Sequence, residues 1–195
     1  MHSDQDFMAV ALRLARRGLG NVAPNPAVGC VIVSGGPDPR VLGRGRTQPG
    51  GRPHAEAVAL DAARERFGAE ALVGATVYVT LEPCNHLGRT PPCADALIRA
   101  RVARVVVACG DPHVRVAGRG IARLRNAGVE VVTDVCKDAA EDINIGFLTA
   151  ATEGRPMVSL KTATTSDGRI ATRTGASQWI TGPAARRHAH LLRAQ

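Results

Sequence analysis

The sequence is poor in aromatic residues, which make up only 3% of its 195 residues. With one tryptophan, one tyrosine and three phenylalanines, the core has to be built mainly from valine, alanine, leucine and isoleucine. The same scarcity leaves few rings that could stack on nucleotide bases, which argues against a protein that binds single-stranded nucleic acid. The apolar fraction of 45% is nevertheless ordinary for a globular protein.

Lysine is almost missing as well, since it occurs only at Lys137 and Lys161. The formal net charge of +8 is therefore carried by arginines, which are spread along the chain rather than clustered. A basic balance gives either a solvated surface or an attraction to an anionic partner. A small phosphorylated substrate fits this charge as well as nucleic acid does, and we expect no nucleic-acid partner.

Long apolar runs are also lacking, because no stretch approaches the roughly 18 residues of a transmembrane helix. Residues 1–6 are polar and acidic, unlike a signal peptide. The sequence has five cysteines, an odd number. We therefore expect a cytoplasmic protein with no disulfide framework, and no membrane partner. Cys30, Cys109 and Cys136 lie in or beside valine-rich runs, where a buried thiol is expected and a metal ligand is the alternative.

Hydrophobic spacing predicts alternating helices and strands along the first three quarters of the chain. Helices are expected at 7–15, 55–68, 93–100, 118–127 and 139–151, and strands at 27–33, 41–45, 75–80, 105–109 and 129–133. Ser3 and Asp6 form a helix-capping pattern, and the first two strands form a hairpin. The alternation predicts a three-layer α/β domain. A boundary at 153–156 and a new strand at 157–163 divide the chain into domains 1–152 and 153–195.

Four residues have the character of a catalytic zinc site: His54, Glu56, Cys84 and Cys93. A catalytic zinc ion takes three protein ligands, here the histidine and the two cysteines, and keeps one position open for water. Glu56 is placed to handle protons. Side chains two residues apart on a helix diverge by about 200°. His54 and Glu56 can therefore reach one cavity only if they lie at the first turn, where we place them.

A histidine-x-glutamate triplet followed by a proline-cysteine pair is the pattern of zinc deaminases. Here eight residues separate Cys84 from Cys93, where that pattern has two. We expect Cys93 to open a helix, because a helix N-terminus favours a thiolate. One alternative is a closed structural zinc site with His86 as fourth ligand. Others are a zinc-stabilised module without activity and a chance arrangement without metal.

The longer motifs resemble the bifunctional deaminase–reductases of riboflavin biosynthesis. The matching segments are 24–29 (PNPAVG), 53–56 (PHAE), 82–93 (EPCNHLGRTPPC), 144–147 (NIGF), 166–171 (SDGRIA) and 178–182 (QWITG). The likeness extends over essentially the whole chain. The long cysteine loop is its specific part, since the histidine-x-glutamate triplet alone indicates only a zinc deaminase.

The resemblance implies a cytidine-deaminase-like fold. It also implies hydrolytic removal of the 2-amino group from 2,5-diamino-6-ribosylamino-4(3H)-pyrimidinone 5′-phosphate, which gives 5-amino-6-ribosylaminouracil 5′-phosphate. By position, Glu56 is similar to the family's proton shuttle, and His54, Cys84 and Cys93 are similar to its zinc ligands. The family's ring or ribose contacts fall on Asn25 and His86, and its phosphate contact falls on Arg89. A zinc deaminase of another nucleobase, nucleoside or tRNA is the rival, although such enzymes usually have the short cysteine spacing.

The resemblance further implies that residues 153–195 begin a dihydrofolate-reductase-like domain. Ala163, Trp179 and Arg193 match family positions that touch NADPH, and Ser177 matches one that touches substrate. NADPH binding requires the complete module, so we expect no reductase activity from this chain as given. The family also implies a homo-oligomer. One departure concerns a substrate contact, because Thr47 stands where many members carry a histidine.

Overall fold

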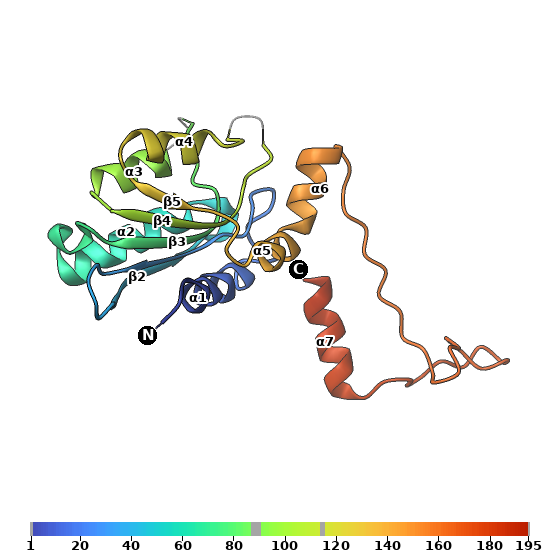
Figure 1. Ribbon diagram of the computed structural model, residues 1–195. Coiled ribbons are helices and arrows are strands. Elements are labelled where there is room, and N and C mark those ends of the chain that lie inside the picture. The colour runs from blue at the N-terminus through green and yellow to red at the C-terminus, as the bar shows by residue number, and fades with distance from the viewer. Residues whose placement is uncertain (1, 87–90, 114–115, 195) are drawn as a thin grey trace. The chain divides into compact units, whose positions relative to one another are not determined.

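The structure is a computed structural model in which residues 2–86, 91–113 and 116–194 are described (Figure 1). The chain divides into two units, Met1–Pro156 and Met157–Gln195. Among the described residues, no helix combines the length and the apolar character that crossing a membrane requires.

A five-stranded sheet forms the centre of the first unit, with its strands in the order β2-β1-β3-β4-β5. The strands are β1 (Gly29–Val33), β2 (Val41–Arg46), β3 (Thr76–Leu81), β4 (Arg104–Cys109) and β5 (Glu130–Val132). β1 is antiparallel to β2 and β3, whereas β3, β4 and β5 run parallel. The predicted hairpin is therefore confirmed. The parallel pairs arise because helical crossovers connect their strands.

Helices cover both faces of this sheet, as predicted (Figure 1). α1 and α5 pack on one face, and α2, α3 and α4 lie on the other. Their bounds are α1 (Asp4–Arg16), α2 (Ala55–Phe67), α3 (Cys93–Arg99), α4 (Arg119–Asn126) and α5 (Lys137–Ile143); α6 (Ile145–Glu153) follows. Short 3-10 turns occupy Pro49–Gly51 and Ala69–Leu72. The three-layer α/β prediction is confirmed.

Local sequence signals explain where the first helix starts and what it buries. The backbone N–H of Asp6 donates to Ser3 Oγ, and the Ser3 N–H donates to Asp6 Oδ2 at 2.8 Å, which completes the predicted capping box. Met8 and Ala11 are fully buried against the sheet. The core is mainly aliphatic, and all residues of β1 are buried.

Two element predictions are wrong. The single helix expected at 139–151 is divided into α5 and α6 at Asn144, whose backbone leaves helical geometry at φ −106° and ψ 17°. The strand expected at 157–163 does not form, since no described segment of the second unit offers it a neighbouring strand. The second unit contains α7 (Pro183–Arg193), and none of its described residues is buried. The side chain of Val158 is 84% exposed and that of Leu160 88%.

Candidate active site

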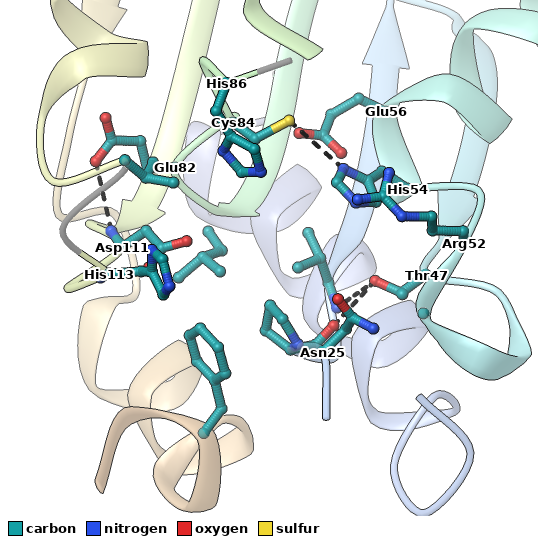
Figure 2. Close-up of a pocket in the computed structure, with 16 residues that line it drawn as sticks. Asn25, Thr47, Arg52, His54, Glu56, Glu82, Cys84, His86, Asp111 and His113 are labelled. Carbon is teal, nitrogen blue, oxygen red and sulfur yellow. Dashed lines mark hydrogen bonds between the residues drawn. The ribbon is translucent and has the colours of Figure 1, made fainter. Parts of the chain in front are cut away.

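The start of α2 places a histidine and a carboxylate in one cavity. His54 is the N-cap residue, with an extended backbone at φ −70° and ψ 158°, and Glu56 lies in the first turn. Because His54 lies just outside the helix and has an extended backbone, its ring does not point where the side chain of a helical residue would point. Figure 2 shows both side chains pointing into the same space, as the first-turn placement predicts.

Two glycines in β2 let α2 lie unusually close to the sheet. A Cβ atom at Gly45 would fall 2.1 Å from the carbonyl oxygen of Ala55, and one at Gly43 would fall 2.1 Å from that of Ala59. Such distances are impossible for a side chain, so only glycine permits this approach. The height of α2 above the sheet, and with it the place of its first turn, is therefore set by these two positions.

The two predicted cysteine ligands come from the end of β3 and the start of α3. Cys93 is the first residue of α3, as expected, and is buried. Its backbone N–H donates to the Sγ of Cys84 at 3.3 Å, and the next N–H, that of Ala94, donates to the Cys84 carbonyl at 3.2 Å. The start of α3 thus holds Cys84 by two backbone hydrogen bonds, one of them to the sulfur.

The donor atoms of His54, Cys84 and Cys93 all lie within 4.8 Å of one another. The Nδ1 atom of His54 is 3.6 Å from the sulfur of Cys84 and 3.4 Å from that of Cys93. A tetrahedral zinc ion with ordinary bond lengths separates its nitrogen and sulfur ligands by about 3.6 Å. The cluster therefore fits zinc. His86 is not part of this cluster, which is the only such cluster among the residues that the structure describes.

Hydrogen bonds between the side chains of the cluster shift the pKa values of its two thiols in opposite directions. Hydrogen bonding to Cys93 and to His54 lowers the pKa of Cys84 to about 4, although burial opposes this. The same hydrogen bond to Cys84, together with burial, raises the pKa of Cys93. The two sulfurs thus share a hydrogen bond, and both would be deprotonated on holding a metal ion, because a coordinating thiol is deprotonated.

Glu56 is the buried acid of the site. Burial first, and the nearby Cys84 second, raise the pKa of its carboxyl to about 7. Hydrogen bonding to Cys84 also raises the pKa of His54, with burial acting in the opposite direction. A carboxyl group with a pKa near neutrality can both accept and return a proton under ordinary conditions.

These groups open onto a cavity of about 210 Å³ (Figure 2). His54, Glu56 and Cys84 line it, together with the predicted substrate contacts Asn25 and His86. The Nδ1 atom of His86 is buried and has no hydrogen-bond partner among the described residues. An unpaired buried nitrogen in a cavity wall is a free hydrogen-bonding position for a ligand.

The loop that carries Asn25 is held from both sides. Thr47 Oγ1 accepts from the Val28 N–H at 3.0 Å and donates to the Pro26 carbonyl at 3.1 Å. The side chain of Asn144 accepts from the N–H of Ala27 at 2.8 Å and donates to its carbonyl at 3.0 Å. Thr47 also lines the cavity, and its hydroxyl forms hydrogen bonds with the loop that carries Asn25.

Sequence reasoning missed several residues of the cavity wall: Arg52, Asp111, His113 and Phe147. Burial raises the pKa of the Asp111 carboxyl. Asp111 and His113 directly follow β4, and β4 runs parallel to β3, which leads to Cys84. Parallel strands bring their carboxyl ends to one edge of a sheet. The position of Asp111 and His113 after β4 was therefore the sequence signal that could have placed them beside Cys84.

Five further predicted site residues are Arg89, Ser177, Ala163, Trp179 and Arg193. Arg89 lies outside the described residues. Ser177, Ala163, Trp179 and Arg193 all line one cavity of about 490 Å³ within the second unit. The guanidinium of Arg186 lies 4.2 Å from the centre of the Trp179 ring. The structure therefore brings these four positions together within their own unit.

Comparison with known proteins decides the family. The family model described as the cytidine and deoxycytidylate deaminase zinc-binding region matches residues 1–109. The chain belongs to this deaminase family. A second model, the RibD C-terminal domain, matches residues 156–195. The matched deaminase region contains the histidine, both cysteines and Glu56, which agrees with the geometry of the cluster.

Several relatives resemble the chain over almost its full length. The riboflavin biosynthesis protein RibD of Escherichia coli is 52% identical over 192 residues, which are 98% of this chain and 50% of that protein. RibD of Aquifex aeolicus is 48% identical over 190 residues, 97% of this chain and 51% of that protein. The chain spans about half the length of the curated relatives it matches.

A solved structure agrees with the fold of this deaminase-family chain. It is the diaminohydroxyphosphoribosylaminopyrimidine deaminase/5-amino-6-(5-phosphoribosylamino)uracil reductase of Thermotoga maritima, at a TM-score of 0.89 and 43% identity. The match covers 97% of this chain and 52% of that one. The predicted cytidine-deaminase-like fold is thereby confirmed.

Proposed function

We propose that the first unit catalyses zinc-dependent hydrolytic deamination of 2,5-diamino-6-ribosylamino-4(3H)-pyrimidinone 5′-phosphate. The observation that carries the proposal is a buried Glu56 beside a three-ligand cluster at the wall of a cavity. The substrate class is supported by relatives named for riboflavin biosynthesis and for this deaminase. The reaction replaces a ring amino group by oxygen and consumes one water for each ammonia released.

His54, Cys84 and Cys93 are the proposed zinc ligands, through Nδ1 and the two sulfurs. Zinc bound there supplies hydroxide at neutral pH by lowering the pKa of its water. Because the cluster offers three ligands, a fourth position stays open, as catalytic zinc sites require. A closed structural site would need His86, whose place outside the cluster argues against it.

Glu56 is the proposed proton shuttle. Its carboxylate takes one proton from the attacking water and gives it to a ring nitrogen. It then takes the remaining proton of the added hydroxyl as the carbonyl forms, and delivers it to the amine, which leaves as ammonia. A pKa of about 7, caused chiefly by burial, suits a group that has to act as base and then as acid. The side chain needs no metal contact for this role.

Asn25 and His86 are the proposed contacts to the ring or ribose. Both line the cavity, and the unpaired Nδ1 of His86 offers a hydrogen bond to the ligand. Arg89 stays the proposed phosphate contact by family position. Arg52 also lines the described part of the cavity wall.

Further proposals concern the rest of the chain and its surroundings. Residues 153–195 are proposed to be the beginning of a reductase domain, supported by the match of residues 156–195 to the RibD C-terminal domain. Ala163, Trp179 and Arg193 would then contact NADPH in the complete module, and Ser177 would contact the substrate. A cytoplasmic homo-oligomer remains our expectation, in keeping with five free cysteines.

The decisive variant is Glu56→Gln, which keeps the shape of the side chain and removes its proton transfer. It is expected to retain about one zinc ion per chain, because Glu56 is not a ligand. We expect deamination to fall by about 100-fold or more, the usual contribution of general acid–base catalysis. Zinc content by atomic spectroscopy and ammonia release from the pyrimidinone phosphate measure the two effects.

The matched control is Glu70→Gln. Glu70 lies in the 3-10 turn that follows α2, and its exposed carboxylate forms an ion pair with Arg101. It should leave both zinc content and turnover unchanged. Loss of zinc in Glu56→Gln would contradict the assigned role. Turnover of cytidine or of a tRNA anticodon stem by the wild type, without turnover of the pyrimidinone phosphate, would overturn the proposed substrate.

A further inference from the structure

A second buried carboxylate, Glu82, lies at the same cavity but belongs to none of the roles described so far. It directly follows β3, two residues before Cys84, and its side chain is almost completely buried. Its own N–H donates to the Cys109 carbonyl at 3.0 Å, so its main chain is fixed to the end of β4. Glu82 also lines the cavity.

The carboxylate of Glu82 accepts backbone hydrogen bonds from four residues after β4, all in one segment whose described residues are 111–113 and 116–121. Oε1 accepts from the N–H groups of Gly120 at 2.9 Å and Ile121 at 3.1 Å. Oε2 accepts from Gly118 at 2.9 Å and, more weakly, from Asp111 at 3.4 Å. Hydrogen bonds to an ionised acceptor are about twice as strong as neutral ones.

Three of these donors belong to the start of α4. The first N–H groups of a helix have no partners within it, and a carboxylate there also interacts favourably with the helix dipole. Glu82 therefore serves as the cap of α4, although it lies 36 or more residues earlier in the chain. The contact is tight, because a Cβ atom at Gly120 would fall 1.9 Å from the Pro83 carbonyl oxygen and 3.2 Å from Glu82 Oε1.

The segment held in this way forms one wall of the cavity. Asp111 and His113 line it, and the His113 N–H donates to Asp111 Oδ1 at 2.8 Å. In Figure 2 these two residues and Glu82 lie across the cavity from His54 and Thr47. Glu82 thus links β3, which leads to Cys84, with the wall that faces the start of α2.

We propose that Glu82 is a positioning residue for substrate binding: its carboxylate holds residues 118–121 and the backbone of Asp111, and so keeps Asp111 and its neighbour His113 in the cavity wall opposite His54. It does not touch the metal cluster and transfers no proton. This inference rests on the proposed deaminase function for its kinetic consequence. Its structural part, the anchoring of the segment, stands on the hydrogen bonds alone.

The anchoring is tested first in the wild-type chain by amide hydrogen exchange with residue resolution. The amides of Gly118, Gly120 and Ile121 should be protected, although helix-start amides ordinarily exchange fast because they lack intrahelical partners. Glu82→Gln replaces one accepting oxygen by an NH₂ group, which leaves two of the donors facing another donor. Protection of these amides should then fall by about tenfold or more.

Steady-state kinetics test the positioning role in the same variant. We expect Glu82→Gln to raise KM for the pyrimidinone phosphate by about tenfold while kcat changes by less than about threefold, since the wall binds substrate but does not react. Zinc content should stay at the wild-type level. Glu82→Asp keeps the charge but shortens the side chain, and it should give an intermediate KM and intermediate protection.

Glu70→Gln serves as the control, because it removes an exposed carboxylate that forms a surface ion pair with Arg101. Unchanged protection in Glu82→Gln, or unprotected amides in the wild type, would overturn the anchoring. A fall in kcat with loss of zinc and unchanged KM would overturn the positioning role. A wild type that fails to deaminate the pyrimidinone phosphate would instead overturn the proposed function, while the exchange result still decides whether Glu82 anchors the segment.

Discussion

At the scale of single residues, Thr47 shows how one side chain can form a cavity wall and brace a loop at once. Its hydroxyl joins the carbonyl of Pro26 to the N–H of Val28, on either side of Ala27. The buried hydroxyl has no capacity left for a strong contact to substrate through its single proton. The threonine therefore acts on Asn25 through the loop.

Thr47→Val tests this bracing because it removes the hydroxyl at constant shape. Two buried backbone groups lose their partner, so the free energy of unfolding should fall by about 1–3 kcal/mol. KM for the pyrimidinone phosphate should rise by about three- to tenfold as Asn25 loses its fixed position. Thr47→Ser keeps the hydroxyl and should restore most of both values. Equal KM values in the two variants would refute the bracing role.

The residues that sequence reasoning found and missed differ in a physical way. His54, Glu56, Cys84 and Cys93 are recognisable because metal ligation and proton transfer demand particular chemical groups at particular spacings. The role of Glu82 requires no particular chemical group at a particular spacing, since any acceptor that reached the start of α4 could cap this helix. The hydrogen-bond partners of Glu82 lie 29 to 39 positions away. Contacts of this kind follow from the path of the chain and not from local pattern.

At the scale of elements, the placement of α2 depends on the glycines of β2. Gly45→Ala would put a methyl group onto the Ala55 carbonyl, next to His54 and Glu56, and Gly43→Ala would do the same one turn later at Ala59. Overpacking of this kind costs about 1–3 kcal/mol of stability. We expect a similar loss of stability from both variants.

The two variants should differ in function. Gly45→Ala displaces the first turn of α2, so kcat for deamination should fall by about tenfold or more, because small misplacement of catalytic groups is costly. Gly43→Ala should cause a clearly smaller fall in kcat. Gly146→Ala is the control, since a Cβ atom there meets nothing within 4 Å. Thermal unfolding and steady-state kinetics on the three proteins decide the question, and equal kcat losses at positions 43 and 45 would contradict it.

Element boundaries show where sequence patterns stop being informative. The apolar spacing continues through 139–151, yet the helix breaks at Asn144 because its side chain bonds Ala27, 117 positions earlier. The apolar run at 157–163 has the composition of a strand but lacks a neighbour in the described part of its unit. Both errors concern a partner distant in the chain: Ala27 is that partner for Asn144, and the described residues of the second unit offer none to 157–163.

At the scale of the whole molecule, the first unit is held together by a network that spans it. Arg104 in β4 makes two hydrogen bonds to Asp4 in α1, each 2.8 Å long, and Tyr78 in β3 donates to the same carboxylate at 2.9 Å. The hydrogen bond to Arg104 is the main cause that lowers the pKa of Asp4. The network ties the N-terminal helix to the sheet across 100 positions of sequence.

Asp4→Asn should therefore change the acid stability of the fold. A carboxyl whose pKa is lowered by folding stabilises the folded state above its unfolded pKa, near 3.8, and loses this effect as the pH falls through the lower folded value. The variant should be less stable than wild type at pH 7, and the difference should shrink below pH 3.8. Urea unfolding at several pH values measures it; a difference that does not depend on pH would exclude the ion pair as the cause.

The scarcity of aromatic residues also divides the optical signals of the chain between its two units. The single tryptophan, Trp179, belongs to the second unit and is 70% exposed, whereas the single tyrosine, Tyr78, is buried in the sheet of the first. Intrinsic tryptophan emission thus originates in the second unit, outside the unit that has the deaminase fold. Tyrosine emission excited near the phenol band, or far-ultraviolet dichroism, is the appropriate signal for following the unit that carries the catalytic cluster.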